Sequence, residues 1–183
     1  PSGTIESGRM SMKLWDKIKK RLFGTSDTEI ERKFLVDTKS YYDKWHPTSK
    51  PIAIAQGYLS LDPERTVRVR LSGRKVYITI KGKPNGIVTP EYEFRIPVLM
   101  AFKLLDMCIK PILHKDRYVE EHDGKIWEID VFHGENKGLI VAEVELDSED
   151  ESILLPSWVS TEVTSDPRYK NANLIKLPYQ KWS

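Results

Sequence analysis

Charged and apolar side chains alternate most clearly in the stretch Glu29-Ile30-Glu31-Arg32-Lys33-Phe34-Leu35-Val36. Because successive side chains of a β-strand point to opposite faces, Glu29, Glu31 and Lys33 would share one face of such a strand. Ile30 and Phe34 would share the other face. On its own, this pattern is typical of any sheet with one face in water. The interpretation changes because the same pattern of charge returns in later stretches of the chain.

Seven later stretches alternate in the same way, and we predict that they are strands. They lie at about 54–61, 65–71, 76–83, 91–96, 113–120, 127–131 and 141–146. The stretch at 54–61 contributes Tyr58 where the others contribute charges. The charges are sorted by sign, since Arg68 and Arg70 belong to a basic strand, whereas Glu128 and Asp130 belong to an acidic one. A sheet with one solvated face does not need such sorting.

A closed barrel explains the sorting better than an open sheet does. We therefore predict an α+β protein, an eight-stranded antiparallel β-barrel (a tunnel) with a charged interior and with helices packed outside. Because dry burial of so many charges would be very costly, the interior must hold water and ions. Gathered carboxylates suit a hard divalent cation such as Mg²⁺ or Mn²⁺. Gathered arginines and lysines suit phosphate, so the pattern favours phosphoryl transfer on a polyphosphate.

The sequence divides into an N-terminal tail, residues 1–27, and the barrel domain, residues 28–183. In the tail, residues 12–23 are predicted to form a basic amphipathic helix whose apolar face consists of Leu14, Trp15, Ile18 and Leu22. This helix could lie on an anionic membrane, but docking on its own domain or on a second copy is favoured. Further helices are predicted after Val36, at 97–109, from the capping box of Ser148 and Glu151 to Pro156, and at 171–176, with a last strand near 158–164.

The composition excludes several classes of protein. Lys and Arg number 29 and Asp and Glu number 27, a net charge of +2 that is too balanced to indicate binding of nucleic acid. No apolar run has the length of a membrane span. The single cysteine, Cys108, allows no internal disulfide and favours a cytoplasmic protein.

An ordered set of short motifs runs through the chain. It begins with the Glu-x-Glu-x-Lys pattern of residues 29–33 and continues through Gln56-Gly57-Tyr58-Leu59, Arg68-Val69-Arg70, Thr79-Ile80-Lys81, Glu91-Tyr92-Glu93, Lys115-Asp116-Arg117-Tyr118, Trp127-Glu128-Ile129-Asp130, Ala142-Glu143-Val144-Glu145, Glu162-Val163-Thr164 and Asp166-Pro167-Arg168-Tyr169-Lys170-Asn171. The set resembles the CYTH domains, or triphosphate tunnel metalloenzymes, and looks most like their short bacterial inorganic triphosphatases. The resemblance covers residues 29 to about 176. It implies an antiparallel tunnel, triphosphate bound inside, and a requirement for Mg²⁺ or Mn²⁺.

Chemistry and resemblance together predict roles for individual side chains. The expected metal ligands are Glu29, Glu31, Glu143 and Glu145. The expected substrate-binding residues are Lys33, Arg68, Arg70, Lys81, Arg95, Lys115 and Arg117. The expected catalytic residues, which position or activate water, are Tyr58, Glu91, Glu93, Lys115 and Asp130. The resemblance implies a Lys115–Tyr58 pair in which the lysine charge lowers the pKa of the tyrosine, and a packing role is the alternative for Tyr58.

The functional hypothesis is metal-dependent hydrolysis of inorganic triphosphate to pyrophosphate and phosphate. Thiamine triphosphatase, nucleoside triphosphatase and class IV-type adenylate cyclase activities would use the same grip on phosphate and are alternatives. A non-catalytic module that binds polyphosphate or nucleotide is a further alternative, although anion binding alone does not need so many carboxylates. Relatives often carry an arginine shortly before the Glu-x-Glu of the fifth strand, where this chain has Val88, Thr89 and Pro90. The sequence leaves a homodimer open.

Overall fold

The computed structural model describes residues 25–36, 47 and 49–182. The helices predicted at 12–23 and directly after Val36 lie outside the described residues. In the described part of the chain, no helix combines the length and the apolar character that crossing a membrane requires.

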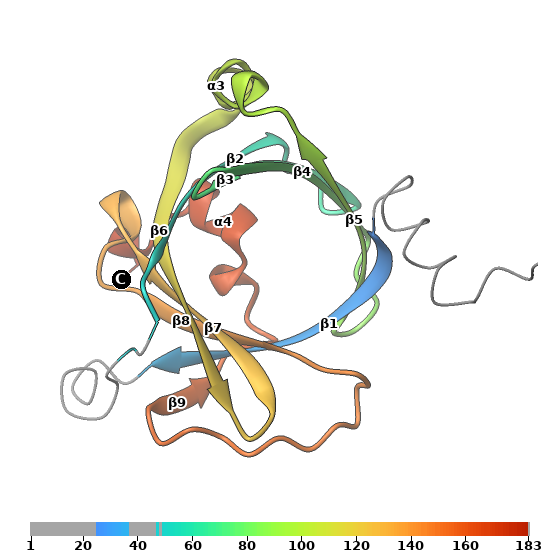
Figure 1. Ribbon diagram of the computed structural model, residues 1–183, viewed down its shortest axis with the longest axis vertical. Coiled ribbons are helices and arrows are strands. Elements are labelled where there is room, and N and C mark those ends of the chain that lie inside the picture. Colours follow the sequence, from blue (N-terminus) through green and yellow to red (C-terminus); the bar gives the residue numbers. More distant parts are fainter. Residues whose placement is uncertain (1–24, 37–46, 48, 183) are drawn as a thin grey trace, which may run out of the picture.

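Eight antiparallel strands close into a barrel, seen end-on in Figure 1. They are β1 (Thr25–Val36), β2 (Ile52–Ser60), β3 (Arg65–Ser72), β4 (Lys75–Gly82), β5 (Val88–Ile96), β6 (Ile109–His122), β7 (Lys125–Phe132) and β8 (Ile140–Glu145). Neighbouring strands are hydrogen-bonded in the order β5-β4-β3-β2-β6-β7-β8-β1, and β1 also pairs with β5, which closes the ring. The predicted eight-stranded barrel is confirmed.

The first strand closes the barrel because it is long enough to pair with two neighbours. Its first half pairs with β5. Its second half pairs with β8, where Glu31 lies opposite Glu145 and Lys33 lies opposite Glu143. A ninth strand, β9 (Val159–Glu162), pairs with the end of β1. The register therefore sets the charges of the Glu-x-Glu-x-Lys motif directly beside those of β8.

Two α-helices and three short 3₁₀ helices complete the described structure, and they are α3 (Val98–Met107), α4 (Asn171–Lys176), η1 (Gly134–Asn136), η2 (Pro167–Tyr169) and η3 (Tyr179–Lys181). Helix α3 packs across β2, β3 and β4. A Cβ atom at Gly57 would lie 2.6 Å from the Cβ atom of Cys108, so only glycine lets the end of α3 approach β2 this closely. The helix predicted at 171–176 is confirmed.

The prediction of a helix between Ser148 and Pro156 is wrong, because residues 147–150 form bends and turns and residues 151–156 form no helix. Glu151 does not complete a capping box. Its Oε2 atom accepts a hydrogen bond from the backbone N–H of Asp147 at 2.6 Å, and its Oε1 atom lies 2.5 Å from Nζ of Lys125 on β7. A contact with the barrel has replaced the local capping interaction.

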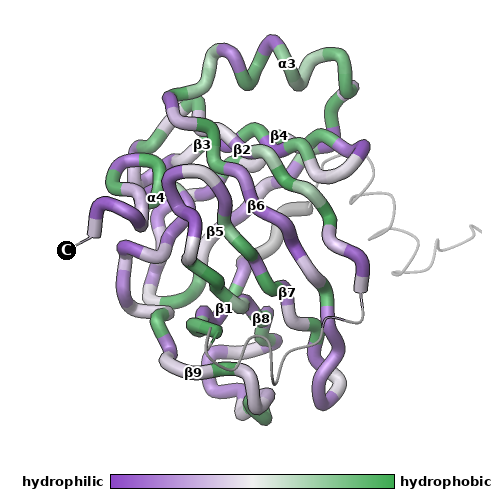
Figure 2. Tube along the Cα trace, turned by 90° about the vertical axis from the view of Figure 1, so that its left-hand side faces the viewer, coloured by the Kyte–Doolittle hydropathy of each residue, from purple (hydrophilic) through white to green (hydrophobic). Residues whose placement is uncertain are grey.

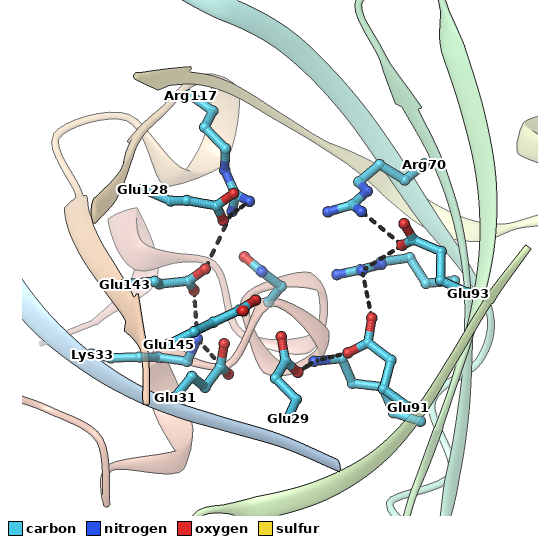
Figure 3. Close-up of a pocket in the computed structure, with 13 residues that line it drawn as sticks. Glu29, Glu31, Lys33, Arg70, Glu91, Glu93, Arg117, Glu128, Glu143 and Glu145 are labelled. Atoms are coloured by element: carbon cyan, nitrogen blue, oxygen red, sulfur yellow. Dashed lines mark hydrogen bonds and ion pairs between the residues drawn. The ribbon is translucent and has the colours of Figure 1, made fainter. Parts of the chain in front are cut away.

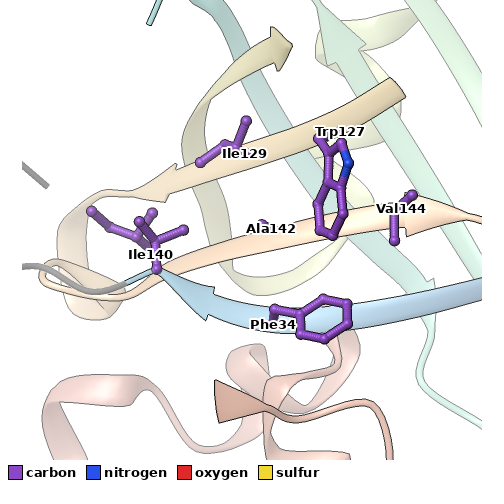
Figure 4. Packing of buried hydrophobic residues seen from close by; sticks show 7 residues of the cluster. Phe34, Trp127, Ile129, Ile140, Ala142 and Val144 are labelled. Atoms are coloured by element: carbon purple, nitrogen blue, oxygen red, sulfur yellow. The ribbon is translucent and has the colours of Figure 1, made fainter. Parts of the chain in front are cut away.

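Apolar side chains cover the outside of the barrel wall at β1, β7 and β8 (Figure 4). Phe34 and Trp127 are at most 1% exposed, with ring centroids 5.6 Å apart, and Trp158 packs edge-on against Trp127 at the same separation. A second cluster lies beneath α3, where Val69 and Val76 are fully buried. Along the barrel strands, hydrophilic and hydrophobic residues both occur, as Figure 2 shows. The apolar rows therefore face outward here, as predicted, and the charged rows face the interior.

Part of the barrel interior is apolar and packs against α4. Tyr58 and Leu113 belong to this cluster with Leu174 and Ile175 of the helix, and all four are at most 4% exposed. These barrel positions continue the inward rows that elsewhere carry charge, since Leu113 is two residues from Lys115 on β6. Apolar side chains and α4 thus limit the charged chamber on one side.

Candidate active site

The charged rows meet in a cavity of about 340 Å³ inside the barrel (Figure 3). Seven carboxylates and five cations line it, together with one amide: Glu29, Glu31, Lys33, Arg68, Arg70, Lys81, Glu91, Glu93, Arg117, Glu128, Glu143, Glu145 and Asn171. The side chains come from β1, β3, β4, β5, β6, β7, β8 and α4. All four predicted metal ligands and five of the predicted substrate-binding residues are therefore brought together.

On the β1–β8 side of the cavity, one lysine joins two glutamates. The Nζ atom of Lys33 lies 2.8 Å from Glu31 and 2.5 Å from Glu143. Burial lowers the pKa of Lys33, but the two carboxylates outweigh burial and raise this pKa well above its usual range. Burial raises the pKa of Glu143, but the charges of Lys33, Lys115 and Arg117 outweigh burial and hold this pKa far below its usual range. Lys33 is a fixed cation at any ordinary pH.

On the β3–β5 side, arginines and glutamates form a second charged group. Arg70 donates to Glu93 at 2.7 Å, and Arg68 lies 3.8 Å from the same carboxylate. Burial, followed by the charge of Arg68, lowers the pKa of Arg70. Two guanidinium groups that repel each other on the wall of the cavity would be stabilised by an anion, and their planar donors suit the oxygens of phosphate.

Lys81 on β4 links the two sides. Its Nζ atom contacts Glu29 on β1 and lies 2.8 Å from Glu91 on β5. Burial lowers the pKa of Lys81, but nearby glutamates outweigh burial and raise it above its usual range. A cation held between the two strands that close the barrel can bind a phosphate that spans the cavity.

Arg117 lines the cavity and also holds a carboxylate, that of Asp130, which is buried behind the cavity wall. Its Nε and Nη2 atoms each donate to Asp130 at 2.7 Å, and Nη2 also donates to Glu143 at 3.2 Å. Asp130 is fully buried and also contacts Nζ of Lys115. Burial, then the charge of Arg117, lowers the pKa of Lys115 to about 8. Neither Asp130 nor Lys115 lines the cavity, whereas Arg117, which holds Asp130, does.

The predicted pairing of Lys115 with Tyr58 is not what the structure shows. The hydroxyl of Tyr58 accepts a hydrogen bond from Gln56 at 3.4 Å, whereas Lys115 is bonded to Asp130. Burial raises the pKa of Tyr58, the direction opposite to the expected one, although Arg68 and other cations act against it. The side chain of Tyr58 packs in the apolar cluster beside α4, in agreement with the alternative interpretation.

Arg95 does not line the cavity, and two lining residues were not among the predicted site residues. Arg95 is exposed near the end of β5. Glu128 lines the cavity and contacts Arg117. Its alternation with Asp130 along β7 was a signal that could have identified it. Asn171 comes from the start of α4, where no strand periodicity points to the interior.

A second cavity of about 380 Å³ continues from the first. The two share five lining residues: Glu31, Lys33, Arg68, Lys81 and Asn171. Beyond them, the lining of the second cavity includes Tyr58, Thr89 of β5, and Lys170 and Lys176 at the two ends of α4. The charged chamber thus extends into a more apolar and basic space.

The carboxylates of β1 and β8 are suited to hold a divalent cation. Burial is the largest cause that raises the pKa of Glu145, and three neighbouring glutamates raise it further: Glu29, Glu128 and Glu31. A hard cation would relieve this repulsion with oxygen ligands. As placed, no three acidic, histidine or cysteine side chains of the described residues form a metal-binding group. Glu29, Glu31 and Glu143 are instead bonded to lysines.

An antiparallel barrel that encloses facing rows of carboxylates and of arginines and lysines belongs to the class of polyphosphate-binding tunnels. The model of the CYTH domain matches residues 27–179, and the chain therefore belongs to the CYTH family.

Two relatives and a solved structure agree with this assignment. An inorganic triphosphatase of Acetivibrio thermocellus is 43% identical over 155 residues, which are 84% of this chain and 97% of that protein. An inorganic triphosphatase of Nitrosomonas europaea is 36% identical over 158 residues, 82% of this chain and 99% of that protein. A crystal structure of an inorganic triphosphatase is similar with a TM-score of 0.57 and 34% identity, covering 80% of this chain and 97% of the other.

Proposed function

We propose that this chain is a divalent-metal-dependent inorganic triphosphatase. It hydrolyses tripolyphosphate to pyrophosphate and phosphate inside the barrel. The observation that carries the proposal is a single cavity in which the carboxylates of β1 and β8 face Arg68, Arg70 and Lys81. Binding of an anion alone would not need the acidic side. The two named relatives are inorganic triphosphatases, which supports the same activity here.

The roles of the two sides follow from their charges. Arg68 and Arg70 would hold phosphate oxygens on one side of the cavity, and Lys81 would hold them at the junction of β1, β4 and β5. Glu29, Glu31 and Glu145, with Glu143 beside them, would hold Mg²⁺ or Mn²⁺. When bound, the metal neutralises charge on the phosphoryl oxygens and favours attack by water. Glu91 and Glu93 are ion-paired with Lys81 and Arg70, respectively, and would orient water or keep these two cations in position.

The proposed activity is tested by comparing substrates. With Mg²⁺ or with Mn²⁺, we expect the highest kcat/KM for tripolyphosphate, because both sides of the cavity are then engaged. Pyrophosphate should be a poor substrate, because two phosphates are too short to reach both the acidic and the basic side. The measurement is phosphate release from tripolyphosphate, pyrophosphate, ATP and thiamine triphosphate. A higher kcat/KM for ATP with formation of cyclic AMP would contradict the proposal, as would full activity in excess EDTA.

Metal binding should depend on pH through Glu145. Because its pKa is raised, this carboxyl keeps its proton at a pH where an ordinary glutamate has lost it. A bound cation expels that proton, so the affinity for Mn²⁺ should fall as the pH is lowered from 7 towards 5. Glu145→Gln should weaken Mn²⁺ binding at least about tenfold at pH 7. Calorimetric titration with Mn²⁺ in the absence of substrate measures both effects.

Glu135→Gln is the control for this titration, because Glu135 is exposed and its partner is Lys181, outside the cavity. It should bind Mn²⁺ as the parent does. Equal affinities of the parent and Glu145→Gln across this pH range would show that Glu145 is not a ligand.

A further inference from the structure

One part of the outer wall of the barrel lacks a cover among the described residues. Where helix α3 or the segment at β9 covers the wall, outward apolar side chains are buried, as at Trp127 beside β9 and at Val69 beneath α3. On β4 and β5, by contrast, Ile80, Tyr92 and Phe94 are 38%, 42% and 39% exposed. We refer to these three residues as the β4–β5 patch.

The register of the two strands gathers the patch into one surface. Ile80 lies opposite Tyr92, and Ile78 lies opposite Phe94. Neighbouring strands are about 4.8 Å apart, and residues on one face of a strand repeat every two positions, about 7 Å. The patch is thus a compact apolar area, and it lies on the wall opposite to the charged rows of the same strands.

The chain reaches this surface directly from its N-terminal tail. At the start of β1, Thr25 lies opposite Glu93 and Ser26 lies opposite Tyr92. Only Gly24 separates Thr25 from the predicted amphipathic helix of residues 12–23. The helix would be about 18 Å long, similar to the span of about six residues along β5. A segment tethered this closely has a high effective concentration at the patch.

The sequence of the tail is complementary to the patch. Leu14, Trp15, Ile18 and Leu22 recur at helical spacing on one face, and Gly24 follows where glycine favours the end of a helix. The family model begins at residue 27, so this segment is not part of the matched barrel domain. We propose that residues 12–23 dock as an amphipathic helix on the β4–β5 patch of their own chain, with the lysines of the helix facing solvent.

Disulfide trapping in the full chain tests this proposal. In a Cys108→Ala background, Ile18→Cys is combined with Tyr92→Cys, and the protein is oxidised with copper phenanthroline in air. We expect most chains to carry an intramolecular disulfide, detected by intact mass and by non-reducing electrophoresis. The matched control combines Ile18→Cys with Leu155→Cys, an exposed position in the segment that precedes β9, and should give little intramolecular product.

Disulfides that join two chains would overturn the proposal in favour of docking on a second copy. Absence of a disulfide in the first pair would also overturn it, as would co-sedimentation of the parent chain with phosphatidylserine vesicles, because the apolar face would then contact lipid.

Thermal stability provides a second measurement. Ile18→Asp should lower the Tm of the parent by several degrees and that of a Tyr92→Ala variant by clearly less, whereas equal losses would contradict docking. Hydrolysis of tripolyphosphate should be unchanged in Ile18→Asp, because the patch lies outside the cavity.

Discussion

The Glu31→Gln variant should hydrolyse tripolyphosphate about 10²- to 10³-fold more slowly than the parent. Glu31 lies opposite Glu145 across β1 and β8, and its carboxylate contacts Lys33 at 2.8 Å. Glutamine keeps the size and the hydrogen-bonding capacity of the side chain but removes the charge that would hold the metal. Because electrostatic stabilisation of the transferring phosphoryl group is the main contribution to catalysis available here, turnover should fall more than KM changes.

The same variant should unfold at nearly the temperature of the parent. Lys33 keeps its ion pair with Glu143, so no buried charge loses its last partner. Glu64→Gln is the matched control, since Glu64 is an exposed glutamate with a lysine partner, Lys83, and does not line the cavity. Its activity and Tm should equal those of the parent. Turnover of Glu31→Gln close to that of the parent would disprove the assignment of Glu31, whatever the melting curves show.

The Arg117→Met variant should be the least stable of these proteins. Arg117 holds both oxygens of Asp130, which is fully buried, and also contacts Glu128 and Glu143. Removal of one partner from a buried ion pair typically costs about 3–5 kcal/mol, and because Asp130 keeps its contact with Lys115, the loss should lie near the lower end of this range. For a chain of this size, that loss corresponds to a decrease in Tm on the order of 10 °C. Differential scanning calorimetry of the variant and the parent measures it.

Two further variants test whether the loss of Tm comes from the buried ion pairs of Arg117. Arg32→Met removes an arginine from a bidentate pair with Glu162 that is partly exposed, and it should cost no more than about 1 kcal/mol. Asp130→Asn and Lys115→Met, combined with Arg117→Met, remove the buried charges of this group together and should recover part of the lost Tm. If the Tm of Arg117→Met equals that of the parent, the buried carboxylate of Asp130 does not need Arg117 as its partner.

The sequence alone determined which side chains face the interior. The alternation along a strand is local, because each residue points opposite to its neighbour whatever the strand pairs with. Glu31, Lys33, Arg70 and Glu143 could therefore be predicted to share one chamber, and the sign of the charges predicted what that chamber holds. The same rule identified the outward apolar row that contains Trp127.

The partners of these side chains were decided only by the tertiary structure. Lys115 is bonded to Asp130 rather than to Tyr58 because β6 pairs with both β2 and β7, and the register of each pair sets which inward side chains come within reach. Arg95 has the correct alternation but lies near the end of β5, where the strand leaves the barrel for α3. The capping signal at Ser148 was overridden by the ion pair of Glu151 with Lys125. Such contacts join residues far apart in the sequence, and their geometry is fixed only when the barrel closes.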